Sequence, residues 1–157
     1  MTVLEHLHAM SPERFLQIYE GLEIQGFGPL DKEVAMSLRF RPQAVRKLPM
    51  VQRAKRAKTI LEAGKSADLA YEVFGAYLIR HRKDLVTGFL DATGVEHQEG
   101  MIEDIEKSKP AGAQVAAAAA DLDTKFPPED VTLYLALAAD QWPDVAELGQ
   151  LVKQRAS

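Results

Sequence analysis

Positive charge is concentrated in one stretch of the chain, residues 39–65. Nine of the nineteen Lys and Arg side chains lie there beside a single acid, Glu62, so this basic segment has a local charge of +8. Residues 1–38 carry two bases and six acids, and residues 66–157 carry eight and sixteen. Clustered ammonium and guanidinium groups bind carboxylates and phosphates. The chemistry that this basic segment could perform is therefore recognition of an anionic partner.

Within the basic segment we expect a helix whose cations surround a narrow apolar stripe. At about 100° per residue, the stripe consists of Met50, Ala54, Ala57 and Leu61. Arg53 and Arg56 fall on one flank of the stripe, and Lys55 lies almost opposite it. This distribution favours long side chains that lie along apolar neighbours over one continuous phosphate-binding face. The residues assigned to a partner-binding surface are Arg46, Lys47, Arg53, Lys55, Arg56 and Lys58.

Three interpretations of the basic segment are open at this point. Its charges are solvated or paired within the chain, they dock an acidic protein partner or a second copy, or they contact nucleic acid or an anionic membrane surface. Phe40 is the only aromatic residue of the segment, whereas a single-strand-binding protein stacks several bases on such rings. We therefore expect a non-enzymatic interaction or adaptor module, with nucleic-acid association through the same segment as the alternative.

An acidic counterpart lies in residues 96–106, within the turn-rich stretch 95–109. This acidic segment contains five carboxylates and one imidazole: Glu96, Glu99, Glu103, Asp104, Glu106 and His97. Oxygen-rich clusters suit magnesium or calcium, but the spacing is not that of an EF-hand loop. We expect a solvated loop. Its pairing with the basic segment, within the chain or across a dimer interface, is a further possibility, at about 0–1 kcal/mol for each exposed pair.

Arg80 is the most unusual single residue of the sequence. It lies about 20° from Leu69 on the helical wheel, on the apolar side of a helix near 67–82. A buried guanidinium requires a carboxylate or several carbonyl partners. We expect Arg80 to be a structural pin, tied to an acid such as Asp84. The alternative is an anion-binding or catalytic pocket with His81 and Asp84, which keeps a helical enzyme as the third functional interpretation.

The sequence contains no other motif that indicates catalysis or cofactor binding. His6 and His8 point about 200° apart on a helix and cannot share a metal ion. The chain has no cysteine, which excludes disulfides, thiolate metal sites and cysteine nucleophiles. Neither a glycine-rich phosphate loop nor a Gly-x-Ser-x-Gly turn is found. We expect no metal and no cofactor.

The elements that must position these residues are expected to be helices. Apolar periodicity predicts about seven or eight of them, and no alternating run indicates a strand. Residues 69–78 are apolar around most of the circumference, so the helix near 67–82 is expected to be central and largely buried. Caps or re-caps at helix starts are predicted at Ser11, Asp31, Ser66 and Asp84.

The composition is that of an ordinary globular protein. With 157 residues, 46% of them apolar and 27% charged, the chain fits a single all-α domain covering 1–157. No stretch approaches the roughly 20 apolar residues that cross a bilayer, and we expect no cleaved signal peptide. The absence of cysteine fits a reducing compartment. The expected location is the cytoplasm.

Overall fold

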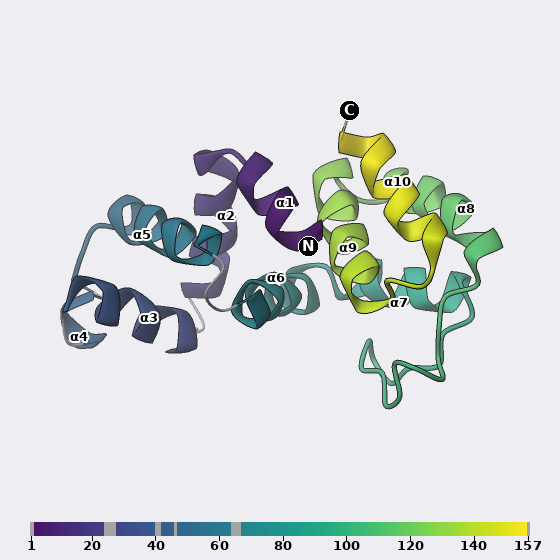
Figure 1. Ribbon diagram of the computed structural model, residues 1–157, viewed down its shortest axis with the longest axis horizontal. Helices are drawn as coiled ribbons and strands as arrows, with labels where there is room; N and C mark the ends of the chain where they lie inside the picture. The colour runs from purple at the N-terminus through teal and green to yellow at the C-terminus, as the bar shows by residue number, and fades with distance from the viewer. Residues whose placement is uncertain (1, 24–27, 40–41, 46, 64–66, 157) are drawn as a thin grey trace. The chain divides into compact units, whose positions relative to one another are not determined.

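The computed structural model describes residues 2–23, 28–39, 42–45, 47–63 and 67–156. These residues form helices and no strand, which confirms the all-α prediction (Figure 1). The helices are α1 (Thr2–Ala9), α2 (Pro12–Glu23), α3 (Gly28–Leu38), α4 (Pro42–Val45), α5 (Met50–Glu62), α6 (Ala67–His81), α7 (Lys83–Ala92), α8 (Gly112–Asp123), α9 (Pro128–Gln141) and α10 (Ala146–Ala156). None of these helices combines the length and the apolar character needed to span a membrane.

The chain divides into two compact units. The N-terminal unit comprises residues 4–77, and the C-terminal unit comprises residues 1–3 and 78–157. The division therefore falls within α6, after Tyr77. Whether both units unfold in one cooperative transition is a separate question, so the single domain over 1–157 stays a prediction.

In the N-terminal unit, α5 packs against both α2 and α3. The start of α2 is as predicted: Pro12 is its first residue, and the Ser11 Oγ accepts a hydrogen bond from the Arg14 N–H at 3.1 Å. Four side chains of α2 at three- and four-residue spacing are buried: Phe15, Ile18, Tyr19 and Leu22. Local signals therefore placed both the start of α2 and its buried face.

The other predicted caps differ from the structure. Asp31 does not cap α3, which begins three residues earlier at Gly28. Instead, Asp31 is buried, and its Oδ1 accepts a hydrogen bond from the Tyr19 hydroxyl at 2.9 Å. Asp84 lies inside the first turn of α7, whose cap residue is Arg82, and Ser66 lies outside the described residues. A carboxylate in a first turn still interacts favourably with the helix dipole.

In the C-terminal unit, α9 packs against α8 and α10, and α7 packs against α8 (Figure 1). Nine of the fourteen residues of α9 are buried, including all of residues 133–139. A helix that is apolar around its circumference is normally covered on several sides. The most fully buried helix of this unit is therefore α9.

The predicted burial of α6 is observed on one side of this helix. The buried side chains between residues 69 and 78 are Leu69, Ala70, Val73, Phe74, Tyr77 and Leu78. Glu72 is exposed, and Tyr71, Gly75 and Ala76 are half-buried. The helix therefore has one open side.

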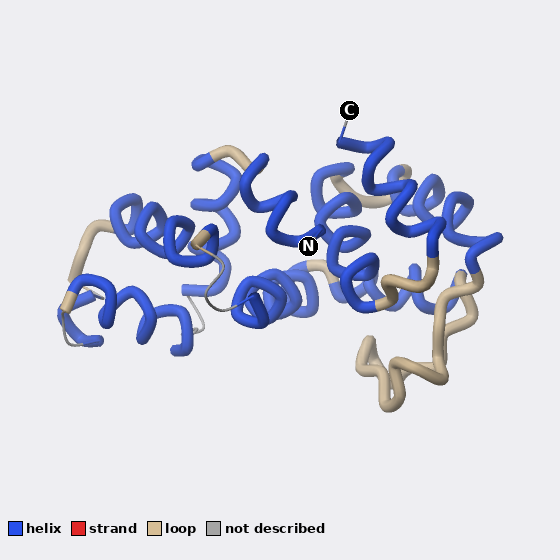
Figure 2. The backbone as a smooth tube through the Cα atoms, viewed as in Figure 1, coloured by secondary structure: helices blue, strands red, loops and turns tan. Residues whose placement is uncertain are grey.

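The longest loop of the described chain connects α7 to α8 and spans residues 93–111 (Figure 2). It contains the acidic segment. The two ends of the loop are joined by a hydrogen bond. The N–H of Ala111, the last residue, donates to the carbonyl of Thr93, the first residue, at 2.9 Å and so closes the loop at its base. Loops of this length without secondary structure of their own are uncommon in compact domains and are usually functional or linker segments.

Candidate interaction surfaces

Arg53 does not belong to an exposed binding surface, contrary to the prediction. It is only 4% exposed, and its guanidinium carbon lies 6.0 Å from the centroid of the Tyr19 ring on α2. On the helical wheel Arg53 is about 40° from the buried Ala57, so the packed face of α5 extends over it. Arginine stacks favourably on aromatic rings and can bury its aliphatic stem. The cation therefore helps to pack α5 against α2.

The other predicted contact residues separate into exposed and engaged side chains. Lys58 is engaged: its side chain is 15% exposed and forms an ion pair with Glu62 one helical turn later. Arg46 lies outside the described residues. The cations that are exposed and form no ion pair with a described residue are Lys47, Lys55 and Arg56. Half of the six predicted residues are thus available to a partner.

An apolar side chain accompanies Lys55 and Arg56 on α5, and Lys47 lies in the turn that precedes this helix. Val51 is 64% exposed and lies one turn before Lys55, so the two side chains are neighbours on the helix surface. The Glu62 carboxylate forms an ion pair with Lys58, and its Oε2 lies 3.8 Å from the His8 Nδ1. We call Lys47, Val51, Lys55 and Arg56 the basic face.

The acidic segment contains a tight hairpin turn near its start. Gln98 and Met101 exchange two backbone hydrogen bonds of 2.8 and 2.9 Å. Glu99 and Gly100 between them have φ values of 53° and 91°, the two positive values of a type I′ turn. A Cβ on Gly100 would lie 3.1 Å from the Ile79 Cδ1. Both the conformation and the close approach therefore require glycine here.

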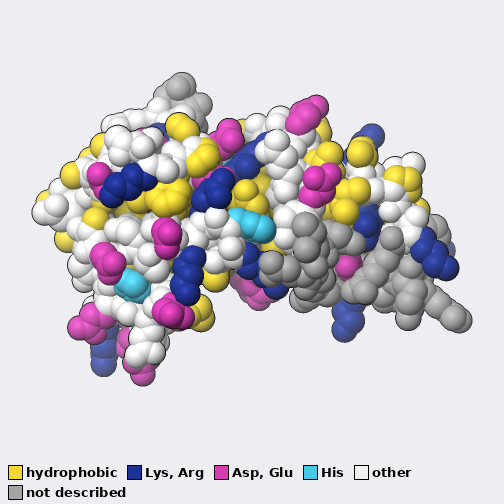
Figure 3. Space-filling view, turned by 180° about the vertical axis from the view of Figure 1, so that it is seen from behind, with side chains coloured by type: hydrophobic (Ala, Val, Ile, Leu, Met, Phe, Trp, Pro, Cys, Tyr) yellow, Lys and Arg dark blue, Asp and Glu magenta, His cyan; other side chains and the backbone are white. Residues whose placement is uncertain are grey.

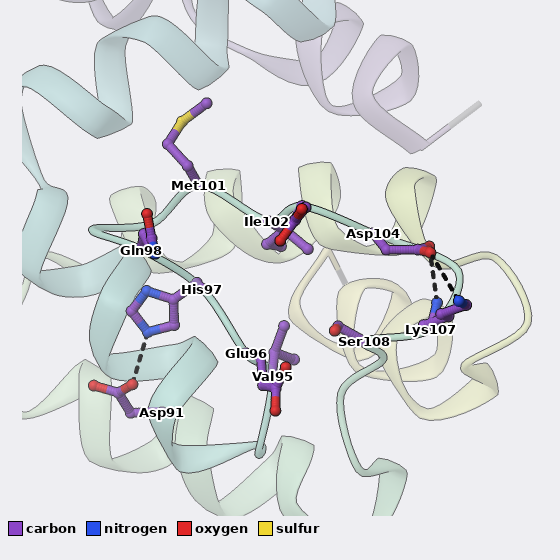
Figure 4. Close-up of a pocket in the computed structure, with 11 residues that line it drawn as sticks. Asp91, Val95, Glu96, His97, Gln98, Met101, Ile102, Asp104, Lys107 and Ser108 are labelled. Atoms are coloured by element: carbon purple, nitrogen blue, oxygen red, sulfur yellow. Dashed lines mark hydrogen bonds and ion pairs between the residues drawn. The ribbon is translucent and has the colours of Figure 1, made fainter.

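His97 fastens this hairpin through both of its ring nitrogens, and Figure 4 shows the contact of one of them with Asp91. Its Nδ1 accepts the Gly100 N–H at 3.0 Å, and its Nε2 lies 2.7 Å from the Asp91 Oδ1. Because Nδ1 accepts, the proton of the neutral ring is assigned to Nε2, which donates it to Asp91. Neither nitrogen has a free lone pair, so this imidazole is not placed to act as a general base.

Trp142 fastens the second half of the acidic segment. Its indole Nε1 donates to the Ile105 carbonyl at 2.9 Å, and the residue is 1% exposed. Further along, Lys109 pairs with Asp144, and the hydrogen bond from Lys109 lowers the pKa of the Asp144 carboxyl. The segment is therefore fixed at several points along its length.

The described carboxylates of the acidic segment do not assemble a metal site. Among the residues that the structure describes, no three potential ligands are close enough to hold an ion. The Glu99 Oε2 lies 3.2 Å from the Lys83 Nζ, and the Asp104 Oδ1 accepts backbone N–H groups of the following turn. The acids that are exposed and form no ion pair with a described residue are Glu96, Glu103 and Glu106.

Exposed apolar side chains lie among these acids. Met101 is 69% exposed and Ile105 is 40% exposed, and Figure 4 shows Met101 extending away from His97. We call Glu96, Met101, Glu103, Ile105 and Glu106 the acidic loop surface. Figure 3 shows acidic side chains gathered over this loop at the lower left.

A hollow lies beside the acidic loop surface and is lined by residues between 91 and 108 (Figure 4). Its volume is about 1320 Å³, above the roughly 300–1,000 Å³ of small-molecule pockets. The lining comes from the loop and from the end of α7. The hollow is therefore a broad, partly open concavity rather than an enclosed ligand site.

Arg80 is exposed, so the prediction of a buried guanidinium was wrong. His81 and Asp84 are exposed as well, and none of the three lines the hollow beside the loop. The buried side of α6 is centred on the wheel near Tyr77, and Arg80 lies at the edge of that arc, in the last helical turn. A long side chain there reaches solvent.

The structural pin is Arg82, two residues further on. Its Nε donates to the Asp130 Oδ2 at 2.7 Å, and Asp130 is 1% exposed. This pair connects the start of α7 to the first turn of α9. Sequence reasoning missed it because nothing local links two residues that are 48 positions apart.

Comparisons with protein-family models, with curated proteins and with solved structures found no match for this chain. Its function must therefore be argued from its own residues. Those residues form two surfaces of opposite charge, the basic face on α5 and the acidic loop surface between α7 and α8.

Proposed function

We propose that this chain is a non-enzymatic, cytoplasmic interaction module that binds an acidic protein segment through the basic face. The observation that carries the proposal is the exposure of Lys55 beside Val51 and of Arg56 on the same helix, with no described carboxylate paired to either cation. Charged groups around an apolar contact give orientation and specificity, and the apolar contact excludes water. The lack of cysteine supports a reducing compartment.

The burial of Arg53 and the ion pair of Lys58 argue against phosphate recognition along α5. Of the six residues predicted to contact a partner, only three cations are then exposed and free of ion pairs among the described residues. Nucleic-acid affinity depends on the number of phosphates neutralised, so a short basic face contributes little of it. An acidic helix or loop needs only a few oriented charges and an apolar anchor. A protein partner is therefore the better match.

The test is fluorescence anisotropy with two labelled probes, an acidic peptide of alternating Glu and Leu and a random-sequence DNA duplex. We expect the peptide to bind more tightly than the duplex. Lys55→Glu combined with Arg56→Glu should abolish peptide binding, because two attractive charges become repulsive. Binding should weaken between about 0.1 M and about 1 M salt, as the Debye length falls from about 10 Å to about 3 Å.

The matched control is Lys107→Glu combined with Lys125→Glu. Both lysines are exposed in the C-terminal unit, and the control changes the net charge by the same amount. It should leave peptide binding unchanged. Tight duplex binding that is lost in the α5 variant would favour the nucleic-acid function, and equal loss in both variants would show that only net charge matters.

A further inference from the structure

Exposed large apolar side chains are concentrated in the two charged surfaces. Across the residues that the structure describes, the large apolar side chains with high exposure are Met36, Val51, Met101 and Ile105. Val51 belongs to the basic face, and Met101 and Ile105 belong to the acidic loop surface. Apolar contacts surrounded by polar groups are the usual anatomy of a protein–protein interface. Each surface therefore has the composition of one half of a contact.

The two surfaces are also complementary in charge. The basic face offers three exposed cations, and the acidic loop surface offers three exposed carboxylates. Within the described chain none of these six groups forms an ion pair. A partner that supplies the opposite charges would neutralise each set, and this chain carries both sets.

The acidic loop surface is preorganised for recognition. The hairpin hydrogen bonds, His97 and the Trp142 contact to the Ile105 carbonyl hold it in one shape. A loop that is ordered before binding loses less conformational entropy when it docks. A solvated acidic loop would need none of these contacts.

We propose that the basic face binds the acidic loop surface of a second copy of this chain. This inference rests on the proposed function and identifies the acidic partner of the basic face as a second copy of this chain. The contact joins two different surfaces, so a pair keeps one basic face unoccupied on one copy and one acidic loop surface unoccupied on the other. Head-to-tail contacts of this kind continue into longer assemblies unless a ring closes. Association of the whole chain is therefore concentration-dependent and weakened by salt.

The experiment is sedimentation velocity of the full chain from micromolar to submillimolar concentration. We expect the average mass to rise with concentration at about 0.1 M salt and to return toward the monomer at about 1 M. Lys55→Gln with Arg56→Gln, the basic variant, and Glu103→Gln with Glu106→Gln, the acidic variant, should each weaken association about tenfold. All four side chains are exposed, so folding should persist, and circular dichroism checks this.

A mixture of the two variants gives the sharper result. The basic variant keeps its acidic loop surface and the acidic variant keeps its basic face, so one intact contact can form between them. We expect the equimolar mixture to form dimers and nothing larger. A wild-type chain that stays monomeric throughout, or a mixture that associates no better than each variant alone, overturns the inference.

These outcomes are separate from the test of the proposed function. If the acidic Glu–Leu peptide binds the basic face but the chain does not self-associate, the inference fails and the proposed function stands. If the peptide does not bind and the chain still self-associates in both variants, both proposals fail. Association that is lost only in the acidic variant also contradicts the inference, because the basic face would then have no part in the contact.

Discussion

The basic face and the acidic loop surface hold their side chains in different ways. On α5, helical periodicity alone places Val51 next to Lys55. In the loop, the display of Met101 and its neighbours depends on contacts such as the Trp142–Ile105 hydrogen bond, which spans 37 positions. A helical surface therefore follows from local sequence, whereas a loop surface depends on distant residues. The predictions below test this difference.

Replacing Trp142 should have the largest effect, because it removes a buried ring and the hydrogen bond to the loop. We expect Trp142→Ala to lower the free energy of unfolding by about 3–5 kcal/mol, measured by urea denaturation with circular dichroism. Trp142→Phe keeps much of the apolar volume and should cost about 1–3 kcal/mol. Trypsin cleavage at Lys107 should become faster in both variants. Unchanged cleavage would show that the loop does not need this contact.

Gly100→Ala should cost about 1–3 kcal/mol, since it places a side chain in a positive-φ conformation and crowds Ile79. Thermal or urea unfolding measures the change. The control is Gly149→Ala in α10, where a Cβ meets nothing within 4 Å, and this substitution should stabilise by about 0.5–1 kcal/mol. Similar effects at both positions would contradict the type I′ turn as the source of loop order.

Arg53→Ala should destabilise the protein by about 1–2 kcal/mol, because it removes the contact with the Tyr19 ring and the buried stem. Lys55→Ala, two positions away on the exposed side of α5, should change stability by less than about 0.5 kcal/mol. Chemical denaturation of both variants measures this contrast. If Arg53→Ala were the harmless one, the assignment of buried and exposed cations on α5 would be reversed.

The smallest effect concerns pH at the end of the loop. The hydrogen bond from Lys109 lowers the pKa of Asp144 below its ordinary 3.8. The pair therefore stabilises the loop above that pH and loses its effect as the pH falls through the folded-state pKa. The protection of the backbone amides of residues 105–111 against hydrogen exchange, after correction for the intrinsic pH dependence of exchange, should fall in acid in the wild type. Asp144→Asn should already show the lower protection at neutral pH, with less additional change in acid.

Local signals predicted much of the helical framework. Ser11 identified the start of α2. Apolar spacing identified the packed stripe of α5, of which Ala54, Ala57 and Leu61 are buried. These predictions succeed because capping and periodicity involve neighbours within one or two turns.

The candidate site was predicted only in part. Three of the six expected contact residues are exposed and unpaired within the described chain, but Arg53 packs on Tyr19 and Lys58 pairs with Glu62. The pin expected at Arg80 is formed by Arg82 instead. A helical wheel gives direction around one axis and carries no information about which neighbours cover each direction.

The amino-acid sequence by itself determined the helical class, the separation of charge along the chain and the repeating apolar spacing within each helix, because these follow from residue type and local geometry. Only the tertiary structure decided which cations stay in solvent and which acid is buried against Arg82. It also decided that the acidic segment is an ordered hairpin. Burial and long-range hydrogen bonds depend on partners far away in the chain, and local propensity does not encode their positions.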